Sequence, residues 1–146
     1  MPPGKVINMH TGLSPYYRGG PCAFWCLYNE ELEYLGVTIH FLTAGIDSGD
    51  IILSRRMADI TPSDNEATLD CKIIKLGVGL MQKAVKMFLE GGLKGVPQWT
   101  KGRVFLYKDF TPERRLDLEK RLKNGLVEKY LSTKGKGLLD SIRTVG

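Results

Sequence analysis

The sequence predicts an α/β domain in which strands and helices alternate along the chain. Two runs rich in β-branched residues, at 36–42 (GVTIHFL) and 50–57 (DIILSRRM), are typical of strands. A long stretch with apolar residues at helical spacing follows at 66–90 and ends at Gly91 and Gly92. Alternation of this kind favours helices packed on a sheet over an all-helical or all-β architecture.

The first predicted strand covers residues 5–10 and ends in polar side chains. Alternate side chains of a strand point to one face, so Asn8 and His10 share a face. Ligands of open α/β sheets bind outside the strand ends, which makes this amide and imidazole candidates for a site. The alternative is a pair of hydrogen-bonded turn residues without a ligand.

A short helix is predicted over CAFWCLYN, residues 22–29, with Pro21 in its entry turn. A polar connector at 29–34 leads from it to the next strand. The chain has three cysteines and no CxxC pair, which argues against a zinc site or a disulfide framework. We therefore expect Cys22 and Cys26, which are four residues apart, to be small buried side chains on one helix face.

The loop TAGIDSG, residues 43–49, joins the two β-branched strands and contains Asp47. It is long for a hairpin turn, and long ordered loops on rigid elements tend to carry function. An aspartate in a DSG sequence is also a common turn former. If the flanking strand lies beside the strand of Asn8 and His10, an amide, an imidazole and a carboxylate converge on one crevice.

The long helix at 66–90 has a predicted start at Ser63, with Glu66 completing a capping box. Apolar residues three and four apart should form its buried stripe. These are Leu69, Ile73, Leu76, Leu80, Ala84 and Phe88.

The last third of the chain reads as a short strand at 102–110 and a second helix that begins at Thr111. That helix is expected to carry Leu116 and Leu122 on its apolar face. Beyond Tyr130 the sequence is rich in glycine and lysine, so we expect the end of the chain to fray.

The formal net charge of +5 is unevenly distributed along the sequence. Residues 1–100 hold 9 Lys/Arg and 10 Asp/Glu, whereas residues 101–146 hold 12 and 6. A basic tail can attract nucleotides, RNA or phosphorylated metabolites, but charge spread over helices is more typical of a solvated surface.

No apolar run approaches the ~18 residues of a membrane span and no apolar leader is present, so we expect a cytoplasmic protein.

Four segments together resemble one known family. INMH, YRGG, GVTIHF and GIDSGDII, in this order, are similar to the folate-dependent formyltransferases, which include methionyl-tRNA, glycinamide ribonucleotide and sugar N-formyltransferases. The resemblance covers roughly residues 5–90. It implies that residues 1–100 form the C-terminal half of a Rossmann-like catalytic domain with a mixed sheet, and that residues 101–146 add a short strand and a basic helical tail packed on it.

The resemblance implies catalytic roles for Asn8, His10 and Asp47 and no metal. In such chemistry an amine attacks the formyl carbon, Asn and His N–H groups stabilise the oxyanion, and a carboxylate takes the proton. The family draws its formyl group from 10-formyltetrahydrofolate, whose pterin lies against the loop before the aspartate. The implied folate-binding residues are Thr43, Ala44, Gly45 and Ile46.

His40, in the GVTIHF segment, has no partner suggested by the sequence. Histidines are intermediate in burial, so we expect this one to serve packing or a structural hydrogen bond.

The expected acceptor is a primary amine on an amino-sugar nucleotide, since the tail looks helical and methionyl-tRNA enzymes carry a C-terminal β-barrel. The alternatives are glycinamide ribonucleotide or methionyl-tRNA as acceptor, hydrolysis of 10-formyltetrahydrofolate, and a non-catalytic assembly or RNA-binding fragment.

Family members have an N-terminal half with a glycine-rich turn, and no such turn precedes Lys5. We therefore expect a separate N-terminal half or a second copy of the chain to cover the exposed sheet edge. Nucleic acid and membrane are not expected as partners.

Overall fold

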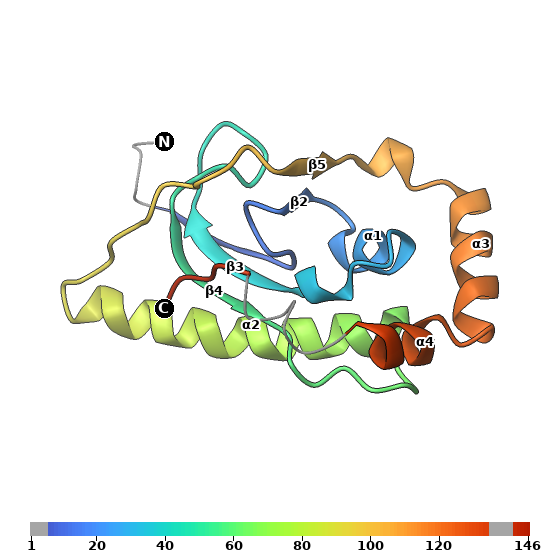
Figure 1. The fold of residues 1–146 in the computed structure, drawn as a ribbon. Coiled ribbons are helices and arrows are strands. Elements are labelled where there is room, and N and C mark those ends of the chain that lie inside the picture. Colours follow the sequence, from blue (N-terminus) through green and yellow to red (C-terminus); the bar gives the residue numbers. More distant parts are fainter. Residues whose placement is uncertain (1–5, 135–141) are drawn as a thin grey trace.

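The computed structural model describes residues 6–134 and 142–146 (Figure 1). Helices and strands mix along the chain, which confirms the predicted α/β class. The predicted fraying beyond Tyr130 falls largely on residues 135–141, which lie outside the described residues. The elements are β1 (Ile7–His10), β2 (Tyr17–Gly19), α1 (Cys22–Tyr28), η1 (Leu32–Tyr34), β3 (Gly36–Phe41), β4 (Ile51–Arg56), α2 (Glu66–Leu89), β5 (Arg103–Phe105), η2 (Tyr107–Asp109), α3 (Pro112–Lys123) and α4 (Leu126–Thr133).

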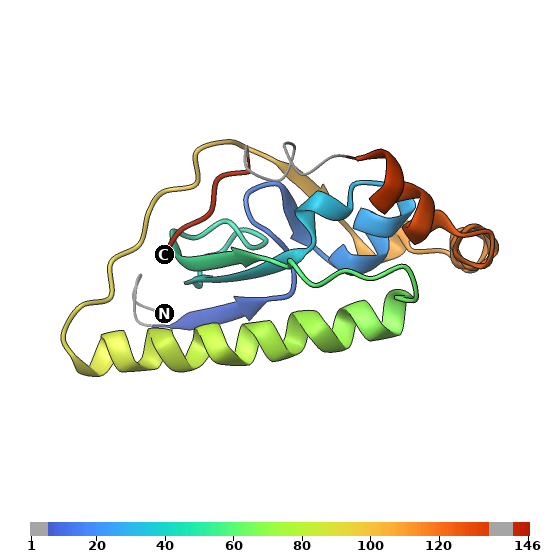
Figure 2. The same ribbon diagram turned by 60° about the horizontal axis from the view of Figure 1, so that its bottom comes forward.

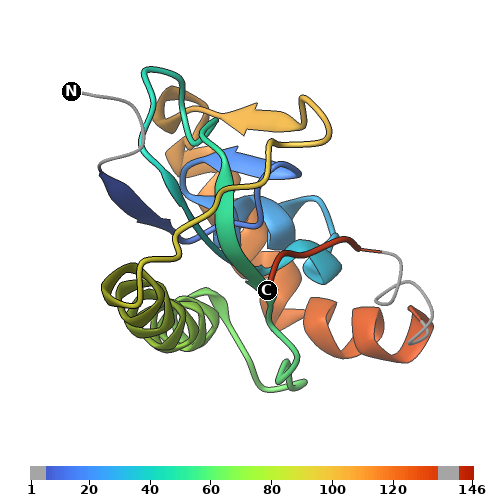
Figure 3. The same cartoon turned by 90° about the vertical axis from the view of Figure 1, so that its left-hand side faces the viewer.

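Three strands form the main sheet in the order β1-β3-β4, and both pairings are antiparallel. The register places Asn8 beside His40 and His10 beside Thr38. The outer edge of β4 is covered, because the backbone of Ile51 bonds that of Val96 and Ser54 N–H donates to the carbonyl of Val145. A second sheet of two parallel strands, β2 and β5, lies beside the first. Figures 1 and 3 both show β2 and β5 side by side.

Helix α2 lies along one face of the main sheet (Figure 2), as its apolar periodicity predicts. Its buried residues are Leu69, Ile73, Gly77, Leu80 and Ala84. A side chain at Gly77 would meet Met9 Sδ at 2.6 Å, so glycine lets the helix approach β1 closely. The prediction for Phe88 was wrong: it is 64% exposed, because the end of α2 extends past the strands (Figure 2).

The start of α2 differs from the predicted capping box. Asn65, with an extended backbone, caps the helix: its side chain accepts from Thr68 N–H at 3.1 Å, and the Thr68 hydroxyl accepts from Asn65 N–H at 2.9 Å. Ser63 instead lies in the preceding turn, where its hydroxyl contacts that of Thr61 at 3.2 Å. The cap is thus shifted by two residues, since Ser63 and Asn65 are both favourable N-cap residues.

The segment Tyr17–Gly19 forms strand β2, which the sequence did not predict. Its partner β5 lies more than 80 residues later, so no local window contains the pair. The predicted strand at 102–110 is shorter than expected, because only Arg103–Phe105 pair before the chain turns into η2.

The C-terminal helices pack on the same core as the rest of the chain. Helix α3 begins at its Thr111 cap as predicted, but its buried leucine is Leu118, whereas Leu116 is 57% exposed. The predicted polar connector contains η1, whose Leu32 is fully buried. Tyr130 of α4 donates its hydroxyl to Glu33 of η1, which ties the tail to this segment.

None of the helices within residues 6–134 and 142–146 is long and apolar enough to cross a membrane. The same residues contain no group of three or more His, Cys, Asp or Glu side chains arranged to hold a metal ion.

Candidate active site

His10 is the last residue of β1, and its side chain is buried. Its Nε2 lies 3.0 Å from the carbonyl of Tyr17, and its Nδ1 lies 3.3 Å from Asp47 Oδ2. The Tyr17 carbonyl and the ionised Asp47 carboxylate both only accept, so the neutral ring can donate to just one of them; we place the proton on Nε2, at the shorter contact, which leaves the Nδ1 lone pair facing the carboxylate. Burial lowers the pKa of His10, and the Asp47 charge opposes this shift only in part.

His40 joins the same cluster: it makes a structural hydrogen bond, as expected, but it also contacts Asn8 and Asp47, which the sequence did not indicate. Its Nδ1 donates to the carbonyl of Phe41 at 2.9 Å, and its Nε2 lies 3.3 Å from both Asn8 Nδ2 and Asp47 Oδ1. The neutral ring accepts a hydrogen bond from Asn8 through Nε2, whereas the doubly protonated ring can donate to Asp47. The antiparallel register of β1 and β3 is what would have revealed this contact.

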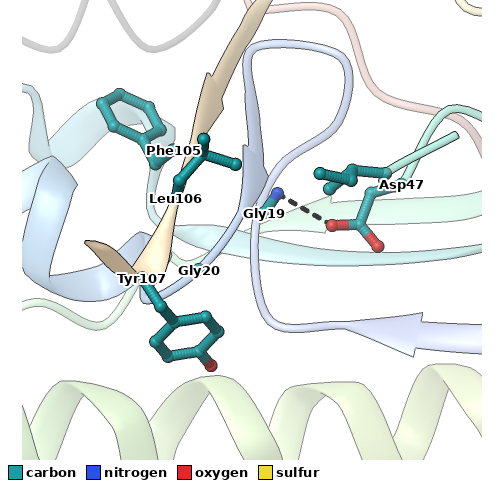
Figure 4. A pocket seen from close by; sticks show the side chains of 7 residues that line it. Gly19, Gly20, Asp47, Phe105, Leu106 and Tyr107 are labelled. Atoms are coloured by element: carbon teal, nitrogen blue, oxygen red, sulfur yellow. Dashed lines mark hydrogen bonds between the residues drawn. The ribbon is translucent and has the colours of Figure 1, made fainter. Parts of the chain in front are cut away.

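Asp47 stands between the two histidines and adopts a left-handed backbone with φ 42°. Its Oδ2 also accepts a hydrogen bond from Gly19 N–H at 2.8 Å (Figure 4). Burial raises the pKa of this carboxyl, but the contacts with His40, His10 and Gly19 N–H outweigh burial and hold the pKa below its usual value. A non-glycine residue in this conformation persists only where its surroundings hold it.

Asn8, His10 and Asp47 lie in one cluster, as predicted, but the path of the chain that brings Asp47 there differs from the expected one. Because β1 and β3 are antiparallel, the loop after β3 starts at the far end of β1 from His10 and must fold back. Gln98 supports the folded loop by donating to the carbonyls of Asp47 at 2.7 Å and Gly49 at 3.0 Å.

A cavity of about 320 Å³ opens beside Asp47. It is lined by Gly19, Gly20, Ile46, Asp47, Phe105, Leu106 and Tyr107. Figure 4 shows Leu106 and the Asp47 carboxylate on opposite sides of Gly19. Of the four residues predicted to bind folate, Ile46 lines this cavity, while Thr43, Ala44 and Gly45 are exposed on the loop and are not among its lining residues.

The lining residues 105–107 come from the tail and were not predicted to belong to the site. No local signal in the sequence would place them there, because their position depends on the pairing of β5 with β2.

Gly12 and Cys22 pack behind the His10 ring. A side chain at Gly12 would overlap His10 Nε2 and lie 2.7 Å from Cys22 Sγ, so this turn requires glycine. Burial raises the pKa of the Cys22 thiol to about 12, with the Asp47 charge acting in the same direction. A thiol with that pKa stays protonated near neutral pH, which excludes it as a thiolate nucleophile.

An amide, two imidazoles and a carboxylate thus lie together on an α/β scaffold, and these are groups suited to acid–base chemistry. Residues 1–85 match the family described as formyl transferase, and the chain belongs to that family. A methionyl-tRNA formyltransferase from Listeria monocytogenes is 38% identical to it over 97 residues, which is 66% of this chain and 30% of the relative. The chain thus spans about 30% of the length of the curated relatives it matches first.

Solved structures of formyltransferases share the fold. The formyltransferase PseJ from Anoxybacillus kamchatkensis, in complex with UDP-4,6-dideoxy-4-formamido-L-AltNAc and tetrahydrofolate, aligns with a TM-score of 0.70 and 26% identity over 85% of this chain and 63% of that one. An N-formyltransferase from Helicobacter canadensis, in complex with folinic acid and dTDP-3-aminofucose, gives a TM-score of 0.67 and 26% identity over 73% of this chain and 39% of that one. The predicted family resemblance and Rossmann-like α/β fold are therefore confirmed.

Proposed function

We propose that this chain carries the formyl-transfer centre of an N-formyltransferase, which moves a formyl group from 10-formyltetrahydrofolate to a primary amine. The observation that carries the proposal is the position of Asp47, 3.3 Å from both His10 and His40, with the Asn8 amide 3.3 Å from His40. Family membership supplies the reaction class, and the site supplies the groups that the reaction needs.

The first step is attack of the amine on the formyl carbon, which turns the formyl oxygen into an oxyanion. Asn8 Nδ2 has two N–H groups, and one of them reaches His40. The other is available to the oxyanion, where one preorganised donor stabilises the transition state by about 3 kcal/mol. His40 thereby fixes the orientation of the amide.

The second requirement is removal of a proton from the attacking nitrogen. Asp47 is the proposed base, because a carboxylate is ionised at neutral pH and this one lies beside both imidazoles. The Nδ1 lone pair of His10 faces the carboxylate at 3.3 Å and can share the proton that Asp47 receives. Both ring nitrogens of His10 are engaged, so its contacts favour this role over the direct oxyanion donation expected from the sequence.

The proposed co-substrate is 10-formyltetrahydrofolate, held against the loop of Thr43, Ala44, Gly45 and Ile46. Two of the similar structures contain tetrahydrofolate or folinic acid, which supports a folate ligand. Ile46 offers an exposed aliphatic side chain at the cavity next to Asp47, and the other three residues are exposed on the loop, where their backbone groups are proposed to bond the folate.

The proposed acceptor is an amino-sugar nucleotide. The likeness to PseJ, whose complex contains a UDP-linked formamido sugar, extends over 85% of this chain. Methionyl-tRNA is the second candidate, because relatives with that name are up to 38% identical. The match to the Listeria monocytogenes relative covers 66% of the chain, which gives less support for the tail than the likeness to PseJ does.

We also propose that the acceptor side is completed by sequence equivalent to the N-terminal half of the relatives' catalytic domain, or by a second copy of the chain. Within the described residues β1 pairs only with β3, so its other edge has free backbone groups for an added strand.

Incubation with 10-formyltetrahydrofolate and separate amines, followed by mass spectrometry, tests the proposal. With the sequence that completes the acceptor side supplied, a UDP- or dTDP-amino sugar should gain one formyl group, and methionyl-tRNA should not. Formate release without any amine would favour the hydrolase alternative. Isothermal titration with tetrahydrofolate checks the ligand separately, and failure to bind it would contradict the proposed function.

A further inference from the structure

The two backbone edges of strand β2 make different contacts: one edge bonds β5, and the other bonds side chains of the candidate site. Toward β5, the carbonyl of Tyr16 accepts from Arg103 N–H at 3.1 Å, and Gly20 N–H donates to the carbonyl of Phe105 at 3.1 Å. Backbone groups of a strand alternate between its edges, so Tyr17 and Gly19 present their groups to the opposite side, whereas those of Arg18 face β5.

That opposite edge of β2 bonds the reacting groups. The Tyr17 carbonyl accepts from His10 Nε2, and Gly19 N–H donates to Asp47 Oδ2. The tautomer of the imidazole and the position of the carboxylate therefore both depend on a strand of three residues. A strand this short is held by its partner and by the packing of its side chains.

The side chains of β5 clamp β2 from outside the sheet. The Arg103 guanidinium lies 4.5 Å from the centre of the Tyr17 ring and pairs with the Glu31 carboxylate. The Tyr17 hydroxyl donates to the same carboxylate, and the buried Tyr17 ring stacks on Phe105 at 4.9 Å. Tyr17 is thus fixed at its ring, its hydroxyl and its carbonyl.

We propose that β5 is a positioning element for the His10–Asp47 pair, acting through β2. The positioning residues are Arg103 of β5 and its partner Glu31, which precedes η1. The segment lies beyond residues 1–85, the part that matches the formyl transferase family, so the tail supplies a function that the family match does not include. The inference rests on the proposed function only in treating the pair as the reacting groups.

The conformation of Gly19 also supports a positioning role for β5. Its φ is +83°, and a side chain there would overlap the carbonyl of Phe105. The backbone of β2 is therefore shaped to meet β5 on one side while it presents its N–H to Asp47 on the other.

The test measures the two histidine rings by ¹⁵N NMR in the full chain, which contains only these two histidines. His40→Gln assigns the signals. In the unsubstituted chain His10 should be the Nε2-protonated tautomer. Arg103→Ala should give a mixture of tautomers and move the His10 pKa up toward about 6.5. Arg103→Lys keeps the charge and should recover part of the original spectrum.

A matched control is Arg121→Ala. Arg121 also pairs with a glutamate, Glu30, and lies over a tyrosine ring, Tyr28, but it ties α3 to α1 and does not touch β2. It should leave the His10 signals unchanged. Glu31→Gln keeps the side-chain shape and gives the same readout if Arg103→Ala does not fold.

The proposal is overturned if Arg103→Ala or Glu31→Gln leaves the His10 tautomer and pKa as they are in the unsubstituted chain. Because this readout needs no turnover, it remains valid if formyl transfer is not found, and the two failures can be told apart.

Discussion

The polar side chains at the end of β1 and those on α3 behave in opposite ways. His10 is 6% exposed, and each of its ring nitrogens has a specific partner. Arg121 on α3 pairs with Glu30 and Asp117, both of which are more than half exposed. Buried polar groups lose much when one partner is removed, whereas solvent replaces the partner of an exposed charge. A search for function based only on the number of charged residues would therefore have selected α3 rather than the end of β1.

The largest effect is expected for Asp47→Asn. Without the carboxylate, the proposed reaction loses its base, and formyl transfer measured by mass spectrometry should fall about 10²- to 10⁴-fold. Asp50→Asn is the control, because Asp50 lies in the same loop but is exposed. Equal activity of the two variants would contradict the role of Asp47.

Alanine substitutions of a buried glycine at the site and of an exposed glycine on a helix should change the free energy of unfolding in opposite directions. Gly12→Ala should lower the free energy of unfolding by about 1–3 kcal/mol, because its methyl group overlaps His10. Gly79→Ala, on the exposed side of α2 with no neighbour within 4 Å, should raise it by about 0.5–1 kcal/mol. Urea unfolding checks both, and a Gly12→Ala chain as stable as the original would show that the turn has room.

Stability should depend on pH through His10. Its pKa in the folded chain lies below the ordinary 6.5, so between these two values the unfolded chain binds a proton that the folded chain does not. Stability should therefore fall as the pH drops below about 6.5, with a slope of at most about 1.4 kcal/mol per pH unit for one proton. Urea midpoints from pH 8 to 5 measure it, and His10→Gln should flatten the slope.

The smallest effect is expected on the exposed surface. Arg121→Ala should cost about 0.2–1 kcal/mol, and added salt should reduce the difference from the original chain. A loss well above this range, insensitive to salt, would show that α3 is held by more than its surface charges.

Local patterns predicted the elements whose cause is local. The periodicity of α2, the Thr111 cap of α3 and the pair of polar residues at the end of β1 all follow from spacing within a few residues. The cap of α2 was misplaced by two residues, because Ser63 and Asn65 are both favourable N-cap residues. Leu116 and Leu118 were confused for a similar reason, since the orientation of a helix is set by what it packs on.

Contacts across long distances in the sequence were beyond local prediction. His40 meets Asn8 through a strand pairing 32 residues apart, and β5 meets β2 across more than 80 residues. Spacing within one segment does not reveal which segment lies beside it, so the second histidine and the cavity wall at 105–107 went unpredicted.

The sequence by itself determined the residue types of the site and the family to which the chain belongs, because these depend on order along the chain. Tertiary structure alone decided which atoms of those residues meet. Register and strand pairing bring Asp47 between two imidazoles and place the Tyr17 carbonyl behind one of them. Such contacts form only when distant backbone segments bond each other, and that is a property of the folded chain as a whole.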